Sequence, residues 1–169
     1  EALTIVRQQV EPPNDRFEDA ASLTGIQASA TGTSLNATRD FGEPNHAGFL
    51  GGASVWWTWT APQNGVVRVD LSGSFTGAVV AVYTGKYVNQ LTQVAANADA
   101  NPDGTGKVRF QVAAETIYAI AVDGKNSLRR GSIQLRLEYA ATDWAPEIVG
   151  EPQDLTLPDK LIKIARAHT

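Results

Sequence analysis

Residues 54–62 read SVWWTWTAP, and this stretch holds three of the four tryptophans of the chain. Successive side chains of a β-strand point to opposite faces of the sheet. Val55, Trp57 and Trp59 therefore share one face, which is uniformly large and apolar. We expect Trp57 and Trp59 in the core of a β-sandwich, where each ring can bury roughly 150–250 Å².

Trp56 points to the other face, among hydroxyl-bearing neighbours, and it has two interpretations. An indole on a solvent-facing sheet can stack on a sugar or on an aromatic side chain of a peptide, which makes Trp56 a candidate ligand-binding residue. Alternatively, a loop such as 40–52 covers it, because exposed tryptophans are uncommon without a reason.

The rest of the chain repeats short alternating runs that are rich in β-branched and aromatic residues. These runs predict strands, and turn residues such as PQNG at 62–65 separate them. Eight strands without intervening helices predict an all-β fold, an antiparallel β-sandwich. One helix is expected at 14–23. The expected strands are 25–31, 54–60, 65–71, 78–84, 91–96, 107–113, 116–123 and 131–139.

The composition excludes several classes of function. The formal charge is −4 and the one adjacent basic pair is Arg129–Arg130, so nothing favours nucleic acid as a partner. Cysteine is absent, which removes disulfides and thiolate sites. No apolar run reaches the ~20 residues of a membrane helix, and we expect no membrane insertion.

The composition changes after Tyr139. We expect residues 1–141 to form the sandwich and residues 142–169 to form a linker and an incomplete tail. The chain lacks methionine and begins with Glu1, so we expect a piece of a longer, multidomain protein whose other domains are its neighbours.

Six motifs occur in an order that resembles one bacterial family. They are NDRFEDAASLTG (14–25), ATRDFGEPNHAG (37–48), GGASVWWTWTAPQNGVV (51–67), AVYTG (81–85), LTQVAANAD (91–99) and IYAIAVDG (117–124). Together they resemble the pre-peptidase C-terminal domain, in the subtype with an SVWW-type strand. The resemblance implies a jelly-roll sandwich in secreted or cell-surface bacterial proteins, without catalytic activity of its own. PEIVGEPQDLTL (146–157) is similar to the opening strand of bacterial immunoglobulin-like repeats.

A calcium site is the best local candidate for metal binding. Asp99, Asn101 and Asp103 alternate ahead of Gly104, and oxygen ligands at every second position are how a loop wraps Ca²⁺. Some relatives in the resembled family bind calcium and matrix protein. However, this chain has Ala98 where many relatives carry an acid, and Phe110 stands where a bidentate glutamate is expected. The alternative is a solvated turn.

The remaining candidates concern binding and catalysis. Tyr87, in the loop GKYVNQ (85–90), is free to reach a partner or to pack over the sheet end. His46 lacks a recognisable nucleophile and orienting acid, so we expect it to hydrogen-bond within its loop. The sequence favours a non-catalytic extracellular module that binds a glycan or protein surface, or spaces its neighbours. The alternatives are a folding-assistance segment removed on maturation and a small hydrolase.

Overall fold

The computed structural model describes residues 10–98 and 101–140. Within them lie nine strands and two short 3-10 turns, and no α-helix. The strands are β1 (Ala21–Leu23), β2 (Gln27–Thr33), β3 (Val55–Thr60), β4 (Gly65–Asp70), β5 (Ala78–Thr84), β6 (Thr92–Asn97), β7 (Lys107–Val112), β8 (Ile117–Gly124) and β9 (Ser132–Tyr139). The turns are η1 (Phe17–Asp19) and η2 (Val88–Gln90).

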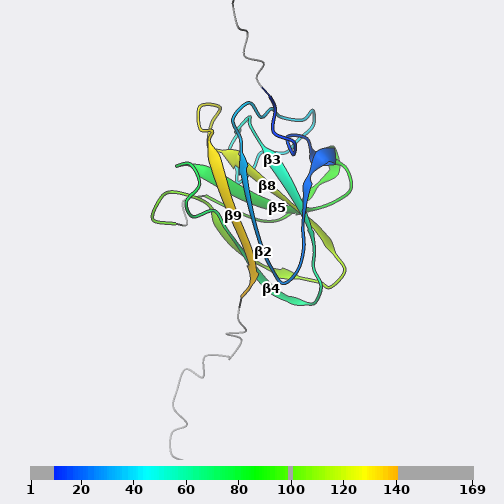
Figure 1. Ribbon diagram of the computed structural model, residues 1–169. Helices are drawn as coiled ribbons and strands as arrows, with labels where there is room; N and C mark the ends of the chain where they lie inside the picture. The colour runs from blue at the N-terminus through cyan, green and yellow to red at the C-terminus, as the bar shows by residue number, and fades with distance from the viewer. Residues whose placement is uncertain (1–9, 99–100, 141–169) are drawn as a thin grey trace, which may run out of the picture.

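The strands form two sheets that face each other. One has the order β1-β3-β8-β5-β6 and the other the order β2-β9-β4-β7. In Figure 1, β2 and β9 lie in front of β3, β8 and β5. All neighbouring strands are antiparallel except β1 and β3, which are parallel. The prediction of an all-β sandwich is confirmed, and the eight expected strands are all present with small differences at their ends.

The main core lies between the two sheets and contains Val55, Trp57 and Trp59 of β3. Trp57 and Trp59 are almost fully buried, as their shared face predicted. The space for Trp57 comes from the facing sheet, where a Cβ on Gly32 would lie 3.2 Å from Cζ2 of the indole. A small residue in β2 thus lets a large ring fill the core, as close packing requires.

The prediction of a helix at 14–23 is wrong. Only the three residues of η1 are helical, and Ala20 leaves the helical region with ψ 130°. The chain then forms β1, in which Ala21 pairs with Trp57 and Leu23 with Trp59. A strand partner for the backbone and burial of Leu23 in the main core outweigh a weak local helix propensity.

Two expectations concern residues outside the described part. The linker and tail at 142–169, with the segment that resembles an immunoglobulin-like repeat, cannot be compared with the structure, and neither can Asp99. Among the described residues, no helix has the length and apolar character needed to cross a membrane.

Candidate functional site

Trp56 lies beneath the surface, on the outer side of the sheet that contains β3. Its exposed fraction is 0%, and its ring contacts Phe17, His46 and Tyr83 at centroid distances of 5.1, 5.2 and 6.0 Å. His46 belongs to the loop 40–52. The prediction that Trp56 offers its indole to a ligand is therefore wrong, and the alternative that this loop covers it is confirmed.

A buried chain of hydrogen bonds fixes the covering loop to the sheet. Nε2 of His46 lies 2.6 Å from Oε1 of Glu43, and Nδ1 of His46 lies 2.8 Å from the hydroxyl of Tyr83 on β5. Burial, with the nearby Glu43 carboxylate, raises the pKa of Tyr83, so its phenol stays neutral. His46 thus bonds within its own loop, as expected, and also bonds the sheet.

The covering loop is also tied to the segment around η1. The amide of Phe17 donates to Oδ2 of Asp40 over 2.9 Å, and the amide of Asp40 donates to Oε2 of Glu43 over 2.9 Å. Asp15 accepts from the amide and the hydroxyl of Thr38 at 2.6 and 2.7 Å. Buried or half-buried carboxylates therefore satisfy backbone donors that would otherwise lack partners.

An open groove lies beside these ties, between three segments of the chain. Its walls come from the segment of η1, from the start of the covering loop and from the loop before η2. The lining residues are Arg16, Phe17, Glu18, Asp40, Phe41, Lys86, Tyr87, Val88 and Asn89. Gly42 has a φ of +82°, and a Cβ there would lie 2.8 Å from Cβ of Asn89. Only glycine permits this approach of the two loops.

Two aromatic rings of the groove are open to solvent. Phe41 is fully exposed and Tyr87 is 54% exposed, while Nζ of Lys86 lies 5.4 Å from the centroid of the Tyr87 ring. The rings of Phe17 and Trp56 form a T-shaped pair with an interplanar angle of 89°. The buried tryptophan thus supports the groove from below, and the accessible aromatic surface is on the loops.

The groove therefore combines apolar surface with matched charge. Arg16 and Lys86 supply two cations, and Glu18 and Asp40 supply two carboxylates. Tyr87 lies where the sequence placed it, in a loop with access to solvent. Phe41 was not among the predicted contacts. A signal for it does exist, because a large aromatic directly before a glycine in a polar loop has no strand face into which it can turn.

Asn101, one of the predicted calcium ligands, is buried in a network that already contains a cation. Its Oδ1 accepts from Nζ of Lys107 over 3.3 Å, and the same ammonium lies 2.9 Å from Oδ2 of Asp70. Burial opposes the charge of Asp70, but hydrogen bonds from Ser72 and the contact with Lys107 outweigh it and lower its pKa to about 2. A lysine ammonium thus lies beside the oxygen that calcium would need.

Asp103, the other described ligand, is occupied by hydrogen bonds of its own turn. It accepts from the amide of Gly73 at 3.0 Å and from the amide and hydroxyl of Thr105 at 3.1 and 2.6 Å. These donors lower its pKa. The described residues hold no group of three or more His, Cys, Asp or Glu able to share a metal ion. With Asp99 outside the described part, the three-ligand site stays a prediction.

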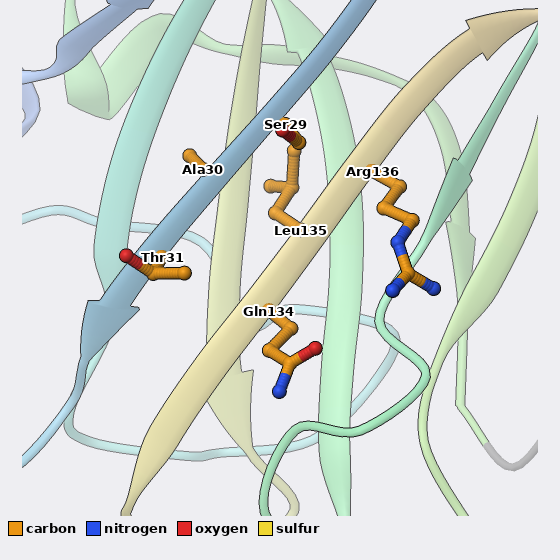
Figure 2. Close-up of a pocket in the computed structure, with 6 residues that line it drawn as sticks. All are labelled: Ser29, Ala30, Thr31, Gln134, Leu135 and Arg136. Carbon is orange, nitrogen blue, oxygen red and sulfur yellow. The ribbon is translucent and has the colours of Figure 1, made fainter.

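A second, shallow hollow lies on the outer face of the other sheet. Ser29, Ala30 and Thr31 of β2 and Gln134, Leu135 and Arg136 of β9 line it, and Figure 2 shows the two strands side by side there. Its accessible groups are two hydroxyls, one amide and one guanidinium, without an aromatic ring.

The groove and the hollow therefore offer different chemistry on different sheets. The groove combines aromatic surface with charges of both signs, whereas the hollow is polar. No family model matches this chain, and no curated protein matches it. The chemistry of these two surfaces is therefore what bears on function.

Proposed function

We propose that this chain is a non-catalytic extracellular module that binds a polymer surface, a glycan or a matrix protein, through the groove of Phe41 and Tyr87. The observation that carries the proposal is the exposure of two aromatic rings that line one groove, on loops of a sandwich. Exposed aromatic groups of this kind mark interaction sites, and tyrosine is enriched among residues that dominate binding energy.

The anchoring of the loops makes the groove suitable for binding. The buried contacts of His46 and the carboxylate of Asp40 hold the loops before a ligand arrives. A preorganised surface loses little conformational entropy on binding. The charges at Arg16, Glu18 and Lys86 supply hydrogen bonds around the apolar rings, which is the arrangement of an apolar centre with a polar rim.

The proposal of a non-catalytic role rests on where the reactive groups lie. Glu43, His46 and Tyr83 form a carboxylate–imidazole–phenol chain, yet each is more than nine-tenths buried. A general base must come within hydrogen-bond reach of the proton that it removes. Both nitrogens of His46 are already engaged within the protein, which favours a structural role for this chain.

We also infer a jelly-roll sandwich and a place within a secreted or cell-surface bacterial protein. Support for the jelly roll comes from strands β2 to β9, which divide into the orders 2-9-4-7 and 3-8-5-6. In an eight-stranded jelly roll numbered in chain order, the two sheets have the orders 1-8-3-6 and 2-7-4-5, which match once β1 is set aside. The place outside the cell rests on the six motifs that resemble the pre-peptidase C-terminal domain.

Retention on insoluble polymers tests the binding role. The wild-type chain is mixed with cellulose, chitin, peptidoglycan and fibrillar collagen, and the bound fraction is measured after sedimentation. We expect retention by at least one polymer, with roughly tenfold or greater loss in Tyr87→Ala and in Phe41→Ala, as for residues that dominate an interface. Leu128→Ala, at an exposed apolar residue outside the groove, is the matched control and should be retained like the wild type.

Three other results would contradict the proposal. A chain that no polymer retains would act as a spacer or as a folding-assistance segment. Release of soluble fragments from a polymer, lost on replacing one carboxylate, would make it a hydrolase. Retention that is equal in the wild type, Tyr87→Ala and Phe41→Ala would place the binding surface elsewhere.

A further inference from the structure

The four edge strands of the two sheets differ in how they are protected. An exposed edge presents unpaired backbone groups, and proteins protect it with short length, bulges, charges or proline. In the described structure, β1 has only three residues. The pairing of β6 with β5 is interrupted by a register shift between Val82 and Tyr83. The third edge strand, β7, carries the charged residues Lys107 and Arg109. Each of these three edges has a protective device.

The fourth edge, β2, has none of these devices. It has seven residues, QASATGT, without a charge or a proline. Its register with β9 runs without a break from Gln27 opposite Glu138 to Thr33 opposite Ser132. A long, regular and uncharged edge is the type of edge that pairs with another strand.

The hydrogen bonds around β9 identify which backbone groups of β2 are free. The amide of Tyr139 donates to the carbonyl of Ile26 over 3.2 Å, and the amide of Ser34 donates to the carbonyl of Gly131 over 3.0 Å. In an antiparallel pair, hydrogen-bonded residues alternate with residues whose groups point away. The even-numbered residues of β2 therefore bond β9, and the odd-numbered residues turn N–H and C=O outward.

We propose that two copies of this chain pair through β2, antiparallel and with a two-fold axis at Ala30. In this register Ser29 lies opposite Thr31 of the other copy, and Gln27 lies opposite Thr33 of the other copy. All of these residues present outward backbone groups, and about eight hydrogen bonds form across the axis. The two four-stranded sheets become one continuous sheet.

The side chains of β2 are compatible with this pairing. On the inner face, Ala28, Ala30 and Gly32 are small, so they do not hold the second strand away. On the outer face, serine and threonine lie across from each other, a pair that hydrogen-bonds well between strands. The nearest guanidinium, at Arg136, is on β9 (Figure 2). Strand spacing puts the two copies of Arg136 about 14 Å or more apart, beyond the screening length.

The symmetry of the edge favours a second copy over a different partner. An uncharged strand has no electrostatic preference for an acidic or a basic peptide, whereas its outward groups complement themselves about Ala30. Pairing of seven residues buries well below the roughly 1,200 Å² of a standard stable interface. The dimer is therefore weak, with a dissociation constant of about 10 μM to 1 mM.

Sedimentation velocity of the full chain from about 5 μM to 1 mM tests the pairing. The wild type is expected to move from monomer toward dimer over this range. Thr31→Pro removes an N–H that faces outward, so the bonds to β9 remain and only the edge is blocked. Thr31→Lys adds a charge to the same edge. We expect each variant to raise the dissociation constant at least about tenfold.

The controls separate edge pairing from loss of fold and from charge alone. Far-UV circular dichroism and the melting temperature show whether each variant is folded. Gln134→Lys puts the same charge on the same face, one strand away from the edge, and should dimerise like the wild type. A wild type that stays monomeric to 1 mM, or folded Thr31 variants that dimerise as the wild type does, would overturn the proposal.

Discussion

Replacing Trp56 by alanine should destabilise the fold strongly. The ring has an exposed fraction of 0% and three aromatic neighbours at 5.1–6.0 Å. Burial of 150–250 Å² at about 25 cal/mol per Å² gives an upper bound of about 4–6 kcal/mol. Truncations of this size in protein cores cost about 3–5 kcal/mol. We therefore expect Trp56→Ala to lower the free energy of unfolding by about 3–5 kcal/mol.

Urea unfolding followed by far-UV circular dichroism measures this loss. With a slope of about 2 kcal/mol per molar urea, the midpoint should fall by about 2 M. Trp56→Phe should cost much less, because it keeps an aromatic ring, and Nε1 of Trp56 has no hydrogen-bond partner in the described structure that would be left unpaired. Tyr87→Ala should stay within about 0.5 kcal/mol of the wild type, as exposed residues do.

The comparison of Trp56→Ala with Tyr87→Ala decides between two roles for Trp56. If Trp56→Ala unfolds with the same midpoint as the wild type and loses retention on a polymer, then the indole is a surface contact and its burial is refuted. If Trp56→Ala is strongly destabilised while Tyr87→Ala loses only retention, the tryptophan supports the groove and the tyrosine makes the contact.

Three further predictions concern acid, packing and metal. The pKa of Asp70 is lowered to about 2. Its ionised carboxylate therefore stabilises the folded state above about pH 4, and this stabilisation is lost as the pH falls toward 2. Asp70→Asn should therefore lose about 1–2 kcal/mol at pH 7, after allowance for partial exposure, and titrate less steeply below pH 4 in urea melts. Gly32→Val should cost about 1–3 kcal/mol in the same assay, because its side chain meets Trp57, whereas Thr31→Val, pointing outward, should be near neutral. Calcium at about 5 mM should leave the melting temperature equal to that with a chelator, because Asn101 and Asp103 are occupied by protein donors. A rise of several degrees would contradict this.

Alternation along the chain predicted most of the fold. The runs of period two located eight strands and put Trp57 and Trp59 in the core, because side-chain direction in a strand follows directly from position. The same rule cannot say what covers an outward-facing residue. Trp56 points away from the main core as predicted. Its ring is enclosed by His46 of the covering loop, Tyr83 of β5 and Phe17 of a third segment, which are far apart in the sequence.

The prediction of a helix at 14–23 failed for a related reason. Local propensity is weak, and β3 offers Ala21 and Leu23 a partner that only the folded chain reveals. The groove of Phe41 and Tyr87 depends on the approach of Gly42 to Asn89, and a contact between two loops has no local pattern in the sequence. Tyr87 was predicted as a single exposed aromatic. Phe41 has a local signal of exposure, but only the fold shows that both rings line one groove.

Hydrogen exchange of the wild-type chain, with and without a saturating amount of the polymer that retains it, tests the binding role most directly. Protection on binding reports which backbone amides the ligand covers or stabilises. The groove predicts slower exchange at residues 16–18, 40–42 and 86–89, with the rest of the described chain unchanged. Protection confined to β2 and β9, or no change at the three groove segments, would contradict the assignment of binding to Phe41 and Tyr87.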